Sequence, residues 1–143
     1  MKTFPKFAGL ALLLVGIAGL PAFAQQSNAE RTDLAGYQKY AGAPVDHVHY
    51  FQINGFQYLA PNKLAIWFGV NKLYLLTVQT PCTNLAFANG IGLTARNNVL
   101  YSKFDAVTFR HQRCTILKIE PVNELQMKRD ARAKASASPK SSG

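Results

Sequence analysis

The sequence predicts a small, mostly β domain of the α+β class. We expect an antiparallel meander or partly closed barrel, with an N-terminal helix and one short inserted helix. Three observations predict this fold. A chain of 143 residues fits one domain. Short apolar runs separated by turn signals follow one another from residue 47 to residue 119. Several of these runs lack a clean apolar–polar alternation, which is typical of strands buried on both faces or of a closed sheet.

The first 24 residues have the three parts of a secretory signal peptide. Lys2 and Lys6 form a positive n-region, residues 8–20 are apolar, and Ala22-Phe23-Ala24 is a small-x-small cleavage motif. The apolar run is shorter than the ~20 residues of a membrane span, and no lipoprotein cysteine stands at the cleavage point. We therefore expect residues 1–24 to be removed, the protein to be periplasmic or secreted, and no transmembrane segment to remain.

The expected domain covers residues 30–126, after a polar and disordered N-terminus at residues 25–29. Residues 30–41 form a short helix that Gly42 stops and Pro44 keeps from continuing. Strands at 47–53 and 56–60 are joined by Asn54-Gly55, which is the strongest short-range hairpin signal because both residues tolerate a positive φ. Two further strands, at 64–70 and 73–78, complete a four-stranded meander.

The second half of the domain begins with the inserted helix. Thr80-Pro81 resembles an N-cap followed by proline at the first helical position, and Asn89-Gly90 provides a stop. Between them Cys82, Leu85, Ala86 and Asn89 fall on one helical face. Strands are then expected at 91–95, 99–101, 104–110 and 113–119, and Pro121 ends the sheet.

More than half of the net charge that remains once residues 1–24 are removed, +4 of +7, lies in the C-terminal segment. The sequence has 16 Lys and Arg against 7 Asp and Glu, a net charge of +9. Residues 127–143 contribute five basic side chains and one acidic one, and they contain no large apolar residue after Met127. We expect this segment to be a disordered basic tail, with a frayed helix near residues 124–133, that makes weak electrostatic contact with anionic surfaces. The remaining charge is small, so the high pI is no argument for nucleic-acid binding.

Cys82 and Cys114 are the two cysteines of the chain. In an exported protein such a pair predicts a disulfide, and this one would link the inserted helix to the last strand. A catalytic redox pair would more often be spaced as C-x-x-C. A pair of free, buried thiols is the other alternative.

These features together resemble a known family. They are the segment Tyr40 to Val45, the strand with Trp67, Pro81-Cys82, the Phe104-Asp105 pair, and the closing C-x-I-x-x-I-x-P-V pattern that begins at Cys114. Over residues 37–122 the chain is similar to small exported proteobacterial proteins known only as a domain of unknown function. The resemblance implies export and a disulfide, and it implies no catalytic motif.

Two groups of polar residues are candidates for a site. His47 and His49 point to the same face of a strand, and His111 could join them in a closed sheet to bind zinc. The alternative is that all three are ordinary surface or partly buried histidines. Asp105 lies in an apolar strand and must be paired or hydrogen-bonded, so we interpret it as a structural polar residue that caps a turn or pairs with Arg110 or Arg113.

The function that the sequence favours is non-enzymatic. The chain has no G-x-S-x-G, H-E-x-x-H or Walker pattern, and we assign it no catalytic residue, no metal ligand and no cofactor. We predict an exported, disulfide-linked binding or envelope-accessory protein whose ligand or partner the sequence does not identify and which does not bind nucleic acid. The alternative is a metal-dependent, hydrolase-like enzyme that uses His47 and His49.

Overall fold

The structure is a computed structural model that describes residues 33–137. The predicted signal peptide and the polar segment 25–29 lie outside the described residues, as do residues 138–143. Within the described part, no helix is both long and apolar enough to cross a bilayer.

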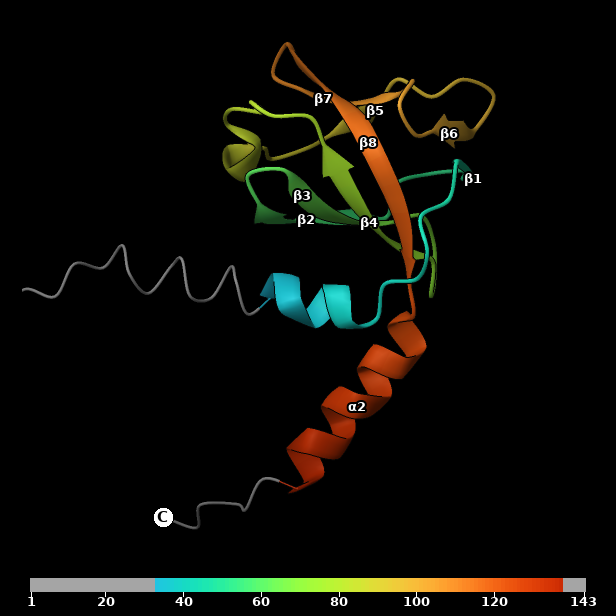
Figure 1. The fold of residues 1–143 in the computed structure, drawn as a ribbon, viewed down its shortest axis with the longest axis vertical. Coiled ribbons are helices and arrows are strands. Elements are labelled where there is room, and N and C mark those ends of the chain that lie inside the picture. Colours follow the sequence, from blue (N-terminus) through green and yellow to red (C-terminus); the bar gives the residue numbers. More distant parts are fainter. Residues whose placement is uncertain (1–32, 138–143) are drawn as a thin grey trace, which may run out of the picture.

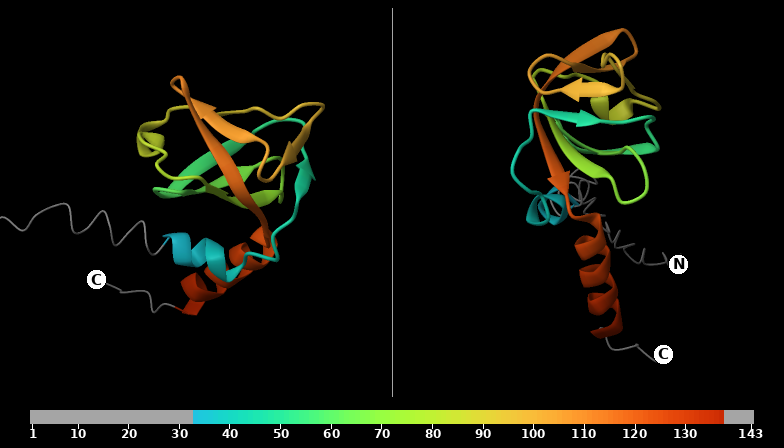
Figure 2. Two further views of the ribbon diagram at one scale, coloured as in Figure 1. Left: turned by 45° about the horizontal axis from the view of Figure 1, so that its top comes forward. Right: turned by 90° about the vertical axis from the view of Figure 1, so that its right-hand side faces the viewer.

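Over residues 33–137 the protein is mostly β, with a six-stranded antiparallel sheet that curls into a half-barrel and two helices (Figures 1 and 2). This confirms the predicted fold class. The sheet has the strand order β2-β3-β4-β8-β7-β5, and β1 pairs with β6 in a separate two-stranded ribbon. The elements are β1 (His47–His49), β2 (Gly55–Ala60), β3 (Lys63–Trp67), β4 (Leu73–Val78), the 3₁₀ helix η1 (Leu85–Phe87), β5 (Gly92–Leu93), β6 (Val99–Tyr101), β7 (Ala106–Phe109), β8 (Gln112–Val122) and α2 (Glu124–Ala137). The other helix covers residues 33–39.

Two apolar cores lie on the two faces of the sheet. The barrel core is enclosed by the half-barrel and the β1–β6 ribbon, and it includes Leu76 and Val78 of β4. The helix-side core, which includes Leu73 and Leu75 of the same strand, packs against residues 34–41 and Met127. All four side chains are almost fully buried. The missing alternation in the sequence of β4 therefore has a simple cause, since both of its faces are covered.

The Asn54-Gly55 hairpin prediction is wrong. β1 is three residues long and pairs with β6, from His47 opposite Tyr101 to His49 opposite Val99. Gly55 is the first residue of β2, which pairs with β3 instead. The ring of Tyr50 stacks on Phe68 at 4.7 Å between centroids, and its backbone N–H donates to the carbonyl of Asn98. These non-local contacts outweigh the local turn preference, and the tight turn of this region is at Pro61-Asn62, between β2 and β3.

The inserted helix is also shorter than predicted. Only Leu85–Phe87 form a single 3₁₀ turn, and Asn84 before it has a left-handed φ of 64°. Of the proposed apolar face, Cys82 and Leu85 are buried, whereas Ala86 and Asn89 are exposed. An apolar stripe of one turn does not support a two-turn helix.

Pro121 does not end the sheet, because β8 continues through it to Val122. The carbonyl of Pro121 accepts a hydrogen bond from the backbone N–H of Gly42 at 2.7 Å, on the edge of β8 that does not face β4. The N–H that proline lacks would lie on that same edge. The β4–β8 ladder therefore loses no hydrogen bond to the proline.

Residues 127–137, predicted to be disordered, belong to the 14-residue helix α2. The side chain of Asn123 accepts a hydrogen bond from the backbone N–H of Gln126 at 3.0 Å and so caps the helix. Glu124 is 94% buried and accepts a hydrogen bond from the indole N–H of Trp67 at 3.1 Å. Tyr40 donates its hydroxyl to Asp130 at 2.6 Å. Alanine, lysine and arginine are strong helix formers, and these anchors fix the first two turns.

Candidate functional site

Cys82 and Cys114 form a disulfide, as predicted. The two sulfur atoms are 2.00 Å apart and the Cα atoms 5.8 Å apart, and both residues are buried in the barrel core. The bond joins the segment after β4 to the beginning of β8. It therefore fixes the otherwise irregular residues 79–91 against the longest strand of the sheet.

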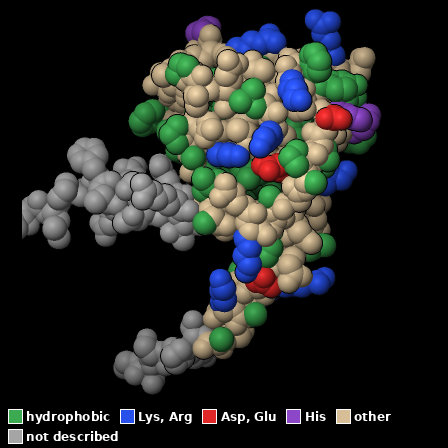
Figure 3. All heavy atoms as spheres, in the orientation of Figure 1, with side chains coloured by type: hydrophobic (Ala, Val, Ile, Leu, Met, Phe, Trp, Pro, Cys, Tyr) green, Lys and Arg blue, Asp and Glu red, His purple; other side chains and the backbone are tan. Residues whose placement is uncertain are grey.

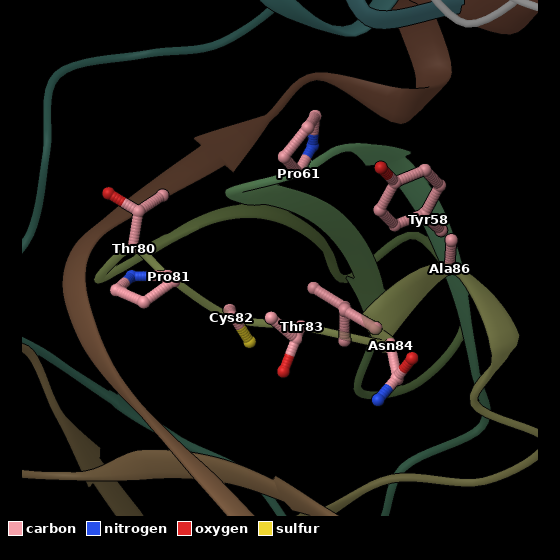
Figure 4. Close-up of a pocket in the computed structure, with 9 residues that line it drawn as sticks. Tyr58, Pro61, Thr80, Pro81, Cys82, Thr83, Asn84 and Ala86 are labelled. Atoms are coloured by element: carbon pink, nitrogen blue, oxygen red, sulfur yellow. The ribbon is translucent and has the colours of Figure 1, made fainter.

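Beside the disulfide the surface is hollowed into a pocket of about 400 Å³. Figure 4 shows Tyr58 of β2 and Pro61 of the following turn across the opening from the segment that carries the disulfide. The lining residues are uncharged and mostly apolar: Tyr58, Pro61, Thr80, Pro81, Cys82, Thr83, Asn84, Leu85 and Ala86. The pocket thus lies next to the edge strand β2, where the half-barrel is open.

The floor of this pocket is held by the disulfide, Leu85 and one polar contact. Leu85 is only 2% exposed and anchors η1 in the barrel core. The side-chain amide of Gln112 donates to the hydroxyl of Thr83 at 2.9 Å, across the same junction that the disulfide spans. The disulfide and this hydrogen bond therefore both hold residues 80–86 against β8. They fix the position of the pocket wall, although most of it is irregular backbone.

Asp105 holds the turn between β6 and β7. Its carboxylate accepts hydrogen bonds from the hydroxyl of Thr94 at 2.9 Å and from the backbone N–H of Tyr101 at 2.8 Å. Thr94 in turn accepts a hydrogen bond from the backbone N–H of Ala106. Within residues 33–137, Asp105 forms no ion pair with Arg110 or Arg113. Burial raises the pKa of Tyr50, and the Asp105 carboxylate adds to this increase.

The three histidines lie at two places. His47 and His49 are exposed on one face of β1, with ring centroids 5.7 Å apart, and the ring of His47 is 5.4 Å from that of Tyr101. His111 is in the tight β7–β8 turn, and Figure 3 shows histidine side chains at two separate positions on the surface. Among residues 33–137 the structure gathers no three His, Cys, Asp or Glu side chains that could hold a metal ion.

Sequence reasoning did not identify the pocket or the anchors of α2. Thr80-Pro81 was interpreted as the start of a helix, and nothing local indicates that it faces Pro61, which lies 20 residues before Pro81. The hydrogen bond between Tyr40 and Asp130 joins positions 90 residues apart. The cysteine pair was the one usable signal, because it marks residue 82 as close to residue 114.

The comparisons with known proteins give one match. A family model described as a family of unknown function, DUF6491, matches residues 6–138. No curated protein and no solved structure matches the chain.

Proposed function

The chain belongs to the DUF6491 family, whose function is unknown, and we propose that it is an exported, non-enzymatic binding protein of the cell envelope. Its ligand is an uncharged, largely apolar small molecule that occupies the pocket beside the disulfide. The observation that carries this proposal is the pocket itself. Its volume of about 400 Å³ lies in the range of known small-molecule sites, which are mostly apolar with a few fixed polar groups.

The lining residues define the chemistry of the ligand. The ring of Tyr58 and the rings of Pro61 and Pro81 offer flat apolar surfaces, and the hydroxyl and amide groups of Thr83 and Asn84 can orient a polar atom. A charged ligand would lose its hydration here without meeting an opposite charge. The site therefore fits a neutral molecule with an apolar body and one or two hydrogen-bonding groups.

Export is supported by the signal-peptide pattern of residues 1–24 and by the disulfide, which persists in oxidising compartments. The test is to fractionate cells that express the chain and to sequence the N-terminus of the product. A periplasmic or secreted product that begins at Gln25 is expected. A cytoplasmic product that keeps its first 24 residues would contradict the export proposal.

The alternative, a metal-dependent hydrolase at His47 and His49, receives no specific support. Within the described part of the chain the pair has no third ligand, and the pair is exposed on the β1–β6 ribbon instead of lining the pocket. We therefore do not propose it as a second function.

The binding proposal can be tested with an uncharged fluorescent probe, 1-N-phenylnaphthylamine, and two matched variants. Ala86 is exposed and lines the pocket, so Ala86→Trp places an indole in the opening without disturbing a core. Phe87, the next residue of η1, is 69% exposed and does not line the pocket, so Phe87→Trp is the control. We expect wild type and Phe87→Trp to bind the probe and Ala86→Trp to bind it at least ten times more weakly. Equal binding by the two variants would refute the pocket as the site.

A further inference from the structure

Helix α2 projects from the sheet, and only its first half is anchored. Figure 1 shows it leaving the half-barrel at the end of β8 and extending beyond the rest of the described chain. Met127 packs on the helix-side core, and Asp130 is bound by Tyr40, Lys39 and Gln126. Residues 131–137 are all exposed. The second half of the helix is therefore exposed and does not pack on the domain.

Five of the six charged side chains of α2 are sorted by sign between two faces of the helix. Its acidic residues, Glu124 and Asp130, are on the face that docks, where Glu124 is buried beside Trp67 and Asp130 is held by Tyr40. The Tyr40 hydroxyl, which donates to the Asp130 carboxylate, lowers the pKa of Asp130. These contacts keep both negative charges turned toward the domain.

Lys134 follows Asp130 by four residues and so lies on the docking face. The other three basic residues of α2 lie on the opposite face. They follow Leu125 at intervals of three, four and seven residues, which places all four side chains on one stripe of the helix. The stripe consists of Leu125, Lys128, Arg129 and Arg132. Leu125 is 49% exposed, and Lys128 pairs with Glu124 at 2.7 Å. Arg129 and Arg132 make no ion pair with any residue in 33–137. Figure 3 shows Lys and Arg side chains gathered along this helix.

We propose that this stripe docks the protein on an anionic phospholipid bilayer. The arginines bind lipid phosphates, which guanidinium groups match in charge and geometry, and Leu125 enters the boundary between headgroups and acyl chains. Charge complementarity selects this partner, because Arg129 and Arg132 have no ion-pair partner within residues 33–137. Lys128, which pairs with Glu124, adds a half-exposed cation to the same stripe. The proposal concerns a surface separate from the pocket and does not depend on a ligand being bound there.

The association is weak, reversible and sensitive to salt. Exposed charges interact over a Debye length of about 8 Å at physiological ionic strength, and a single leucine adds too little apolar area for stable insertion. Each basic residue near an anionic membrane raises the binding constant about fivefold. The loss of the two unpaired arginines should therefore lower it about 30-fold.

The test is co-sedimentation of the purified protein with vesicles of phosphatidylglycerol and phosphatidylcholine, and with vesicles of phosphatidylcholine alone. The variant is Arg129→Gln/Arg132→Gln. The control is Arg113→Gln/Lys118→Gln, which removes two exposed charges of β8 and has the same net charge. Circular dichroism at 222 nm verifies that both keep their helix content.

We expect wild type and control to bind the anionic vesicles at low salt and to lose binding at high salt. The Arg129/Arg132 variant should bind about 30-fold more weakly. Equal binding by variant and control, or equal binding to phosphatidylcholine alone, would overturn the proposal. Two competitors, a single-stranded oligonucleotide and soluble phosphatidylglycerol headgroups, are then added to the bound protein. If the oligonucleotide displaces the protein at the lower concentration, the stripe is a nucleic-acid surface and the membrane proposal is overturned.

Discussion

Opening the Cys82–Cys114 disulfide is expected to lower the stability of the domain substantially. The two cysteines are 32 positions apart. The chain-entropy relation gives about 3.7 kcal/mol of stabilisation at 25 °C for a loop of this size, because the cross-link restricts the unfolded chain. Domains of this size are stable by only about 5–15 kcal/mol. At about 4 °C per kcal/mol, the melting temperature should fall by roughly 15 °C.

The assay compares four thermal melts: wild type and Cys82→Ala/Cys114→Ala, each with and without tris(2-carboxyethyl)phosphine. Reduced wild type keeps both buried sulfur atoms, so its difference from oxidised wild type isolates the cross-link from the loss of core volume. The alanine variant should melt near the reduced wild type and should not respond to the reductant. Intact mass after alkylation should show no modified thiol in protein purified without reductant. A difference of less than about 5 °C between oxidised and reduced wild type would refute the entropic argument.

Three further predictions concern separate parts of the molecule. A Cβ on Gly92 would stand 2.8 Å from the hydroxyl oxygen of Thr108, so Gly92→Ala should lower the free energy of unfolding in urea by about 1–2 kcal/mol. The control is Gly90→Ala, whose Cβ meets nothing within 4 Å and which should leave the free energy of unfolding unchanged. Truncation after Gln126 removes the partly buried Met127 and should lower the melting temperature by about 5 °C, whereas removal of residues 132–143 alone should leave it unchanged. Saturating zinc should leave the melting temperature unchanged. A metal bound at 100 times its dissociation constant would add about 2.7 kcal/mol to the free energy of unfolding, so a rise in melting temperature that His49→Ala abolishes would reopen the metal interpretation.

The parts of the fold that the sequence predicted well are those set by local signals. β4 has the bounds that its apolar run indicated, and the disulfide followed from the two cysteines together with the expected export. The partner of β1 could not be predicted, because its pairing with β6 joins residues about 50 positions apart. Val48 faces Leu100 there and both are buried in the barrel core. Asn54-Gly55 was a strong local signal that this tertiary packing overrode.

The error about the C-terminal segment has a related cause. Its composition is low in large apolar residues, which indicated disorder, but the same alanines, lysines and arginines favour helix once the first turn is fixed. The residues that fix it, Tyr40 and Trp67, come from distant parts of the chain. Likewise, the pocket could not be predicted, because it is formed by residues of β2, of the turn after it and of segment 80–86, which only the curling of the sheet brings together.

The two proposed surfaces should act independently, since they lie toward opposite ends of one strand. Cys114 ties β8 to the pocket segment, and Val122 leads into α2. The eight residue-to-residue steps from Cys114 to Val122 span about 27 Å at the usual rise of a strand, which is more than three Debye lengths at physiological salt. Arg129→Gln/Arg132→Gln should therefore leave the affinity for 1-N-phenylnaphthylamine unchanged, and Ala86→Trp should leave vesicle binding unchanged. If either variant impaired both activities by more than threefold, with the melting temperature intact, the two surfaces would be one site and their separate assignment would be wrong.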